Sequence, residues 1–182
     1  MQLWLPILLS AVFVFIASSI LNMVLSFWHR PDYRGFGNED EVLAALRKGM
    51  TGPGMYMAPY CTPEHMKDPD IQQKFATGPL VNAAIKAGGT MSIGKSLLQW
   101  FVFCLGVSLL CALITVHSLP VGAPFSQVFC VIGIAALLGH AAGPFPNAIW
   151  WSHPWVTSFK HVIDGVLYAL IVAATFAWLW PH

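Results

Sequence analysis

Four long apolar stretches constrain this chain more than any other feature of its sequence. They cover about residues 3–28, 95–117, 124–142 and 157–180, and the third is the shortest. A helix needs roughly 20 residues to cross about 30 Å of hydrocarbon. Each stretch is continuously apolar rather than alternating, which favours helices over the strands of a membrane barrel. The sequence therefore predicts an all-α, multi-pass integral membrane protein built as a bundle of four transmembrane helices.

Composition agrees with this fold class. Only 9% of the residues are charged and 57% are hydrophobic, whereas soluble domains carry about 25% charged residues. The formal net charge of +1 argues against nucleic acid as a partner, because phosphate binding needs a basic surface. The first stretch has no basic residues before it and no clear cleavage site, so we expect a retained span rather than a signal peptide. The lipid bilayer is the partner that the composition predicts.

The basic residues predict an orientation. Eight of the nine lysines and arginines lie between the first two spans, and Lys160 opens the fourth span on the same side. Cytoplasmic segments of membrane proteins carry an excess of these residues. We therefore expect segment 29–94 to lie in the cytoplasm and both termini to lie outside.

Segment 29–94 carries several helix start signals. Residues 38–49 combine an Asn cap, an acidic first turn, a basic last turn and a glycine stop. Residues 62–64 and 68–70 each place a capping residue before a proline and an acid, as the first turn of a helix does. The sequence thus predicts a short-helix cytoplasmic loop beneath the bundle, within a single membrane domain over residues 1–182.

Residues 89–96 match the phosphate-loop pattern G-x-x-x-x-G-K-[ST]. Such a loop joins a buried strand to a helix whose N-terminus holds the phosphates. Here no core strand is expected upstream, because residues 79–89 are short and alanine-rich, and a membrane span follows. We interpret the match as accidental, with Ser92 or Ser96 capping the following helix, and we expect no nucleotide and no cofactor. A lipid phosphate at this helix start is the alternative.

Cysteine and methionine patterns predict no metal site. Cys61, Cys104, Cys111 and Cys130 show no spacing typical of disulfides or zinc ligands. The Met-, Cys- and His-containing loop over residues 50–66 offers soft ligands that suit copper(I), but it equally suits an apolar loop at the membrane interface. No nucleophile has an evident base, so we predict no catalytic residues and do not favour an enzyme.

Charged residues inside a membrane span are costly and motivate a functional hypothesis. Lys160 and His161 precede Asp164 by four and three residues and share its helix face. One interpretation is a proton relay between Asp164 and a histidine. The other is that Lys160 neutralises Asp164 while the histidines lie among the headgroups. The predicted cluster on this side of the membrane comprises Asp164, His161, Lys160, His140, Tyr168, Asn22 and Gln99, with His29 at the end of the first span.

Small residues recur every four positions on two spans. The fourth span carries Gly165, Ala169, Ala173 and Ala177, and the third carries Ala135, Gly139 and Gly143. Such ladders let membrane helices approach closely. The pattern leaves open whether the partner helix is internal, a second copy or another membrane protein.

Several segments resemble an uncharacterised family of small bacterial inner-membrane proteins with four predicted helices. The resemblance rests on FWHRPDYRGFGNEDEVLAAL, FATGP, IGKSLLQWFV and DGVLYALIVAATFAWLWP. It covers most of the chain. The resemblance implies a bacterial inner-membrane setting, and it implies no activity because no function is attached to the family.

Two classes of function are compatible with these features. The first is an accessory or interaction subunit of a larger membrane complex, which suits the small size and the helix-packing ladders. The alternative is a small proton-linked transporter or ion-conducting protein that uses the polar cluster around Asp164. No internal repeat is present to indicate an inverted-repeat transporter.

Overall fold

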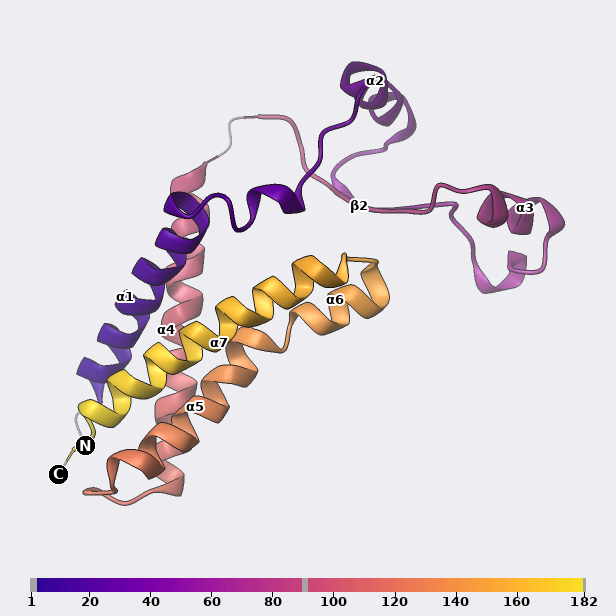
Figure 1. Cartoon of the computed structure of the whole chain (residues 1–182). Helices are drawn as coiled ribbons and strands as arrows, with labels where there is room; N and C mark the ends of the chain where they lie inside the picture. Colours follow the sequence, from indigo (N-terminus) through magenta and orange to yellow (C-terminus); the bar gives the residue numbers. More distant parts are fainter. Residues whose placement is uncertain (1–2, 90–91, 182) are drawn as a thin grey trace. The chain divides into compact units, whose positions relative to one another are not determined.

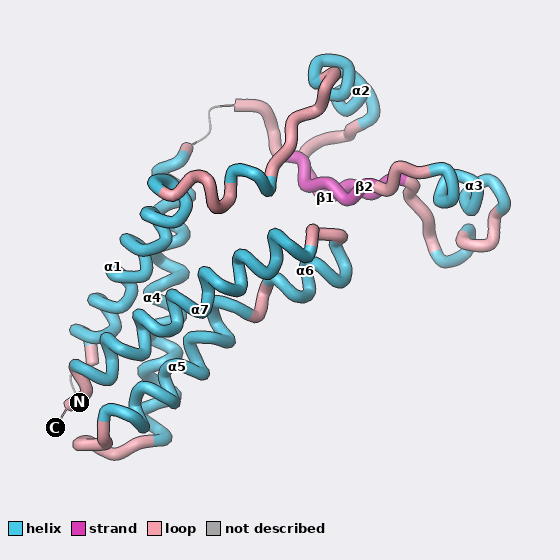
Figure 2. Tube along the Cα trace, viewed as in Figure 1, coloured by secondary structure: helices cyan, strands magenta, loops and turns pink. Residues whose placement is uncertain are grey.

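The computed structural model describes residues 3–89 and 92–181 as a mostly helical chain (Figure 1, Figure 2). Within these residues, four helical segments are long and apolar enough to cross a membrane: Trp4–Val24, Ile93–Ser118, Phe125–Trp151 and Trp155–Trp178. This confirms the predicted class of a multi-pass helical protein. The chain forms two compact units, one of residues 3–34 with 92–181 and one of residues 35–89.

The first unit contains the four apolar segments. Its elements are α1 (Trp4–Ser19), the π-helical turn η1 (Ile20–Val24), the 3-10 turn η2 (Arg30–Asp32), α4 (Ile93–Ser118), α5 (Phe125–Ala141), α6 (Pro144–Trp151) and α7 (Trp155–Trp178). The start of α1, the end of α7 and the α4–α5 connection lie at the same end of the bundle (Figure 1). There the indole of Trp180 donates a hydrogen bond to the carbonyl of Pro120 at 3.2 Å, which ties the end of the chain to that connection.

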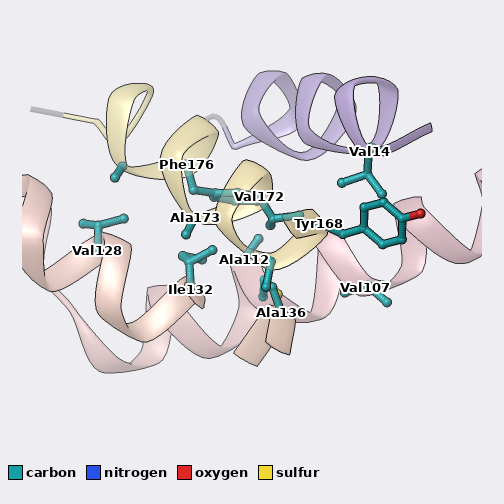
Figure 3. Packing of buried hydrophobic residues seen from close by; sticks show 14 of the residues in the cluster. Val14, Val107, Ala112, Val128, Ile132, Ala136, Tyr168, Val172, Ala173 and Phe176 are labelled. Atoms are coloured by element: carbon teal, nitrogen blue, oxygen red, sulfur yellow. The ribbon is translucent and has the colours of Figure 1, made fainter. Parts of the chain in front are cut away.

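Helix α7 lies at the centre of the bundle. Half of its span, 50%, is buried, against 22–28% of the other three spans. Figure 3 shows Val172 and Phe176 of α7 beside Ile132 of α5, with Val14 of α1 and Ala112 of α4 completing the core. The outer faces of the other helices keep large apolar side chains exposed, as lipid-facing helices do.

The small-residue ladders pack against each other inside the chain. A Cβ atom added at Gly165 would lie 2.6 Å from the carbonyl oxygen of His140 and 2.8 Å from the Cα of Ala141. One added at Gly139 would lie 2.9 Å from Cγ1 of Val107. Glycine therefore permits the close contact of α5 with α7 and with α4, so at Gly165 and Gly139 the ladders pack against helices of the same chain, whereas a Cβ added at Gly143 meets nothing within 4 Å.

The second unit corrects the expectation of a purely helical loop. It contains α2 (Glu39–Gly49), β1 (Gly54–Ala58), the 3-10 turn η3 (Pro63–His65), α3 (Pro69–Thr77) and β2 (Val81–Ile85). The helices begin where the sequence predicts, and a carboxylate oxygen of Asp68 caps α3 by accepting the Asp70 N–H at 2.9 Å. However, β1 and β2 pair antiparallel, with Gly54 opposite Ile85 and Ala58 opposite Val81. The all-α prediction was wrong at these two strands.

The region of the phosphate-loop match is only partly as predicted. A strand, β2, precedes it where none was expected, but this strand belongs to a two-stranded sheet whose residues are mostly exposed. Ser92 is the N-cap of α4, because its hydroxyl accepts the backbone N–H of Lys95 at 3.3 Å. This selects one of the two capping residues that the sequence predicts. Residues 90 and 91 of the motif lie outside the described residues.

Candidate functional site

The segment after α1 brings an imidazole and a carboxylate together. Pro31 lies in the first turn of η2, and the backbone N–H of Asp32 donates to the carbonyl of His29 at 3.0 Å. In a 3-10 turn the side chains at positions i and i+3 are nearly eclipsed. As a result, Nδ1 of His29 lies 3.0 Å from Oδ2 of Asp32.

The same segment holds both oxygens of Asp164 on α7. The indole Nε1 of Trp28 donates to Oδ1 at 2.9 Å, and Nε2 of His29 lies 2.7 Å from Oδ2. Asp164 and His29 are only 5% and 8% exposed. A neutral imidazole has one N–H, so a neutral His29 can donate a hydrogen bond to only one of the two carboxylates. A hydrogen bond at both ring nitrogens requires one further proton, on His29 or on one of the carboxylates.

Lys160 pairs with a different carboxylate from the one that the sequence indicated. Its Nζ donates to Oδ1 of Asp32 at 2.6 Å and to the carbonyl of Trp28 at 2.8 Å. The interpretation that Lys160 neutralises Asp164 was therefore wrong. Asp32, which follows the first span, forms the ion pair with the Lys160 ammonium instead. The hydrogen bond from Lys160 lowers the pKa of the Asp32 carboxyl, against the opposing effect of burial. In the part of the chain that the structure describes, no lysine or arginine pairs with Asp164.

His161 adds a second imidazole to this network. Its ring stacks on that of His29, with centroids 4.8 Å apart and an interplanar angle of 15°. Its Nδ1 lies 4.0 Å from Oδ2 of Asp164, as the i, i+3 spacing on α7 predicts. The side chain of His161 is 47% exposed, so it connects the buried network to the surroundings of the helix bundle.

A cavity of about 630 Å³ adjoins the network. Five residues of the predicted cluster line it: Asn22, His140, His161, Asp164 and Tyr168. Two members of the predicted cluster are placed elsewhere. Gln99 is exposed on α4 and does not line the cavity, and Lys160 is turned to Asp32.

His140 presents unused hydrogen-bonding groups beside this cavity. Both of its ring nitrogens are buried and have no hydrogen-bond partner among residues 3–89 and 92–181. Aromatic rings surround it, with the centroids of Phe103 and Tyr168 each 5.7 Å away and that of Trp100 6.3 Å away. A buried polar group without a partner is costly, so this imidazole is available to a ligand in the cavity.

Sequence reasoning missed two members of the network. The predicted cluster includes neither Trp28 nor Asp32. The signal that could have found them is the His29-x-x-Asp32 spacing with Pro31 between, directly after an apolar span. Their partners lie 128 to 136 residues away on α7, so the pairing itself has no local signature.

Three side chains of the network could hold a metal ion. One ligand atom from each of His29, His161 and Asp164 lies within 4.8 Å of the others. Spacing did not predict this site because its ligands come from two distant segments. Among the described residues, loop 50–66 contributes no comparable His, Cys, Asp or Glu group, and the four cysteines are free.

The site therefore combines a buried carboxylate, two imidazoles and an adjoining cavity within the apolar unit. Such an arrangement can bind a cation or transfer a proton, and fold alone does not choose between activities. Comparison with family models, curated proteins and solved structures finds no match to this chain.

Proposed function

We propose that this chain binds a cation at Asp164 and moves it across the membrane, as a small transporter or ion-conducting protein. The observation that carries the proposal is the pairing of Lys160 with Asp32, which leaves Asp164 buried without a lysine or arginine partner in the described residues. An ionised carboxylate in an apolar environment is costly unless a cation compensates it. A cation taken from solution meets that need.

The cavity supports access to the site from one end of the bundle. Its lining includes Ile93 at the start of α4 and His153 between α6 and α7. Toward the other end, the hydroxyls of Thr115 and Thr175 donate back to carbonyls of their own helices, at 2.8 and 2.7 Å. These two hydroxyl protons are therefore already used within their own helices. A transporter gives access to its site from one end at a time, and the position of the cavity fits that requirement.

Cation flux tests this proposal. The purified protein, reconstituted in liposomes adsorbed to a solid support, is exposed to rapid steps of protons, K⁺, Na⁺ or Zn²⁺. We expect a transient current with at least one of these cations. The isosteric variant Asp164→Asn should lose this current, because it removes the negative charge that the cation compensates. The matched control is Glu39→Gln, which removes an exposed acid of α2 and should leave the current unchanged. Equal currents in wild type and Asp164→Asn, or no current with any cation, would refute the proposal.

We also propose that the protein lies in a bacterial inner membrane with segment 29–94 in the cytoplasm and both termini outside. The concentration of Lys and Arg in segment 29–94 supports the orientation, and the resemblance to small bacterial inner-membrane proteins supports the kind of membrane. With Cys104, Cys111 and Cys130 replaced by alanine, we expect a membrane-impermeant maleimide to label Cys61 only after the membrane is opened. In the same background, Cys61→Ala with Val121→Cys, in the α4–α5 connection, should be labelled in intact spheroplasts. The reverse pattern would invert the topology.

The accessory-subunit hypothesis stays a prediction. In the small-residue ladders that motivated it, Gly165 and Gly139 have close neighbours within the chain, and Gly143 has none within 4 Å. Purification from native membranes in mild detergent, with mass spectrometry of co-migrating proteins, tests for a stoichiometric partner. Migration of the chain alone would count against this hypothesis.

A further inference from the structure

We infer that His29, His161 and Asp164 form a binding site for a divalent first-row transition cation of the Zn²⁺ class. This inference rests on the proposed function and names its substrate class. The ligand set is two imidazole nitrogens and one carboxylate oxygen. Imidazole ligands suit zinc and its neighbours, whereas calcium and magnesium prefer all-oxygen sites and copper(I) prefers sulfur.

The distances between the ligand atoms are compatible with one shared ion. Two atoms bound to a tetrahedral Zn²⁺ lie about 3.3 Å apart, because each Zn–N or Zn–O bond is about 2.0–2.1 Å long. The observed separations from Oδ2 of Asp164 fall on either side of that value, at 2.7 Å to Nε2 of His29 and 4.0 Å to Nδ1 of His161. The His161 ring is half exposed, so it can rotate to close the longer distance.

Groups around the site hold each ligand in the orientation that metal binding needs. Metal-binding histidines usually donate their second ring N–H to a carboxylate, which fixes the tautomer. Nδ1 of His29 lies 3.0 Å from Asp32, which leaves Nε2 directed toward Asp164, and Lys160 anchors Asp32 in turn. Trp28 occupies the other oxygen of Asp164. Oδ2 is thereby left on the side of the two imidazoles.

The charge of the site favours a cation. Two carboxylates, Asp32 and Asp164, face one ammonium, that of Lys160. With neutral imidazoles, the site therefore carries one net negative charge. His161 and Asp164 also line the cavity of about 630 Å³, which leaves room for water or a further ligand in the fourth position of the ion. Catalytic zinc sites likewise have three protein ligands and keep the fourth position open for water or substrate.

Metal titration of the full chain tests the site. The protein is purified in mild detergent with a histidine-free tag, stripped with a chelator, and titrated with Zn²⁺ by calorimetry and with Co²⁺ by visible absorption. We expect one ion per chain and the absorption bands of tetrahedral Co²⁺. His161→Gln removes a half-exposed ligand without breaking the buried network, and should weaken Zn²⁺ binding at least about tenfold. His117→Gln changes an exposed histidine in the last turn of α4 that does not line the cavity and should leave the affinity unchanged.

The outcomes separate this inference from the proposed function. Absence of one-to-one Zn²⁺ binding, or equal affinity in wild type and a His161→Gln variant with unchanged thermal midpoint, would overturn the metal site. Proton, K⁺ or Na⁺ currents that depend on Asp164 without any Zn²⁺ binding would leave the transporter proposal standing and the metal site refuted. One-to-one Zn²⁺ binding with no current for any cation would leave the metal site standing and refute the transporter proposal.

Discussion

Gly165→Ala is expected to destabilise the bundle by about 3 kcal/mol, the upper part of the range for inserting a methyl group into a packed interior. The added Cβ would lie 2.6 Å from the carbonyl oxygen of His140 and 2.8 Å from the Cα of Ala141. Both are backbone atoms, which cannot rotate away as the end of a side chain can. Helix α5 must therefore move from α7 beside Asp164. The fraction folded during titration with a denaturing detergent measures the loss.

The chain offers a matched control in the middle of α4. An added Cβ at Gly106 meets nothing within 4 Å, so Gly106→Ala changes helix propensity without a collision. Alanine is favoured over glycine in helices by up to about 1 kcal/mol, and this variant should be as stable as wild type or slightly more stable. If Gly165→Ala and Gly106→Ala unfold at the same detergent fraction, the close contact of α5 with α7 is not present in the membrane.

Lys160→Met is expected to cost about 1.5–3 kcal/mol, because it removes the charged donor of a partly buried ion pair and leaves the carboxylate of Asp32 uncompensated. The side chain of Asp32 is only 5% exposed and that of Lys160 18%, so water replaces little of the lost interaction. The variant also loses the donor to the carbonyl of Trp28. The same unfolding titration measures the effect.

A double variant distinguishes the loss of the ion pair from the loss of side-chain packing as the cause of the reduced stability. Asp32→Asn in the Lys160→Met background removes the orphaned charge, and we expect it to recover part of the lost stability. Lys95→Met, which changes an exposed lysine at the start of α4, should change stability by no more than about 0.5 kcal/mol. A Lys160→Met variant as stable as wild type, or a double variant less stable than either single one, would contradict the pairing.

The helices were predictable because their signals are local. Each apolar stretch carries its own length and composition, and Asp68 caps α3 through a contact two residues away. The strands β1 and β2 were not predictable by the same reasoning. They are five residues each, and most of these residues are exposed, so the sequence shows no alternation of buried apolar and exposed polar side chains. Their pairing also spans α3, which hides the usual signal of a tight hairpin.

The candidate site was partly predictable. Depth along the spans placed Asn22, His140 and Tyr168 near Asp164, and all four line the cavity. The partner of Lys160 could not be found this way. The i, i+4 spacing on α7 indicated Asp164, whereas the acceptor in the structure is Asp32, in the segment that follows the first span. Which of two acids takes an ammonium depends on helix placement in three dimensions, and spacing along one helix does not contain that information.

The long sequence separation within the network has a consequence for how the protein is made. Segment 28–32 is synthesised 128 or more residues before its partners on α7, and chains grow from the N-terminus. Until α7 inserts, His29 and Asp32 have each other as a local partner, but Nε2 of His29 and Oδ1 of Asp32 lack the partners that Asp164 and Lys160 provide. A chain interrupted before α7 therefore leaves these two atoms without those partners at the end of the first span. Helix α7 follows the other helices of the bundle along the chain, so the site is complete only after α7 has joined segment 28–32.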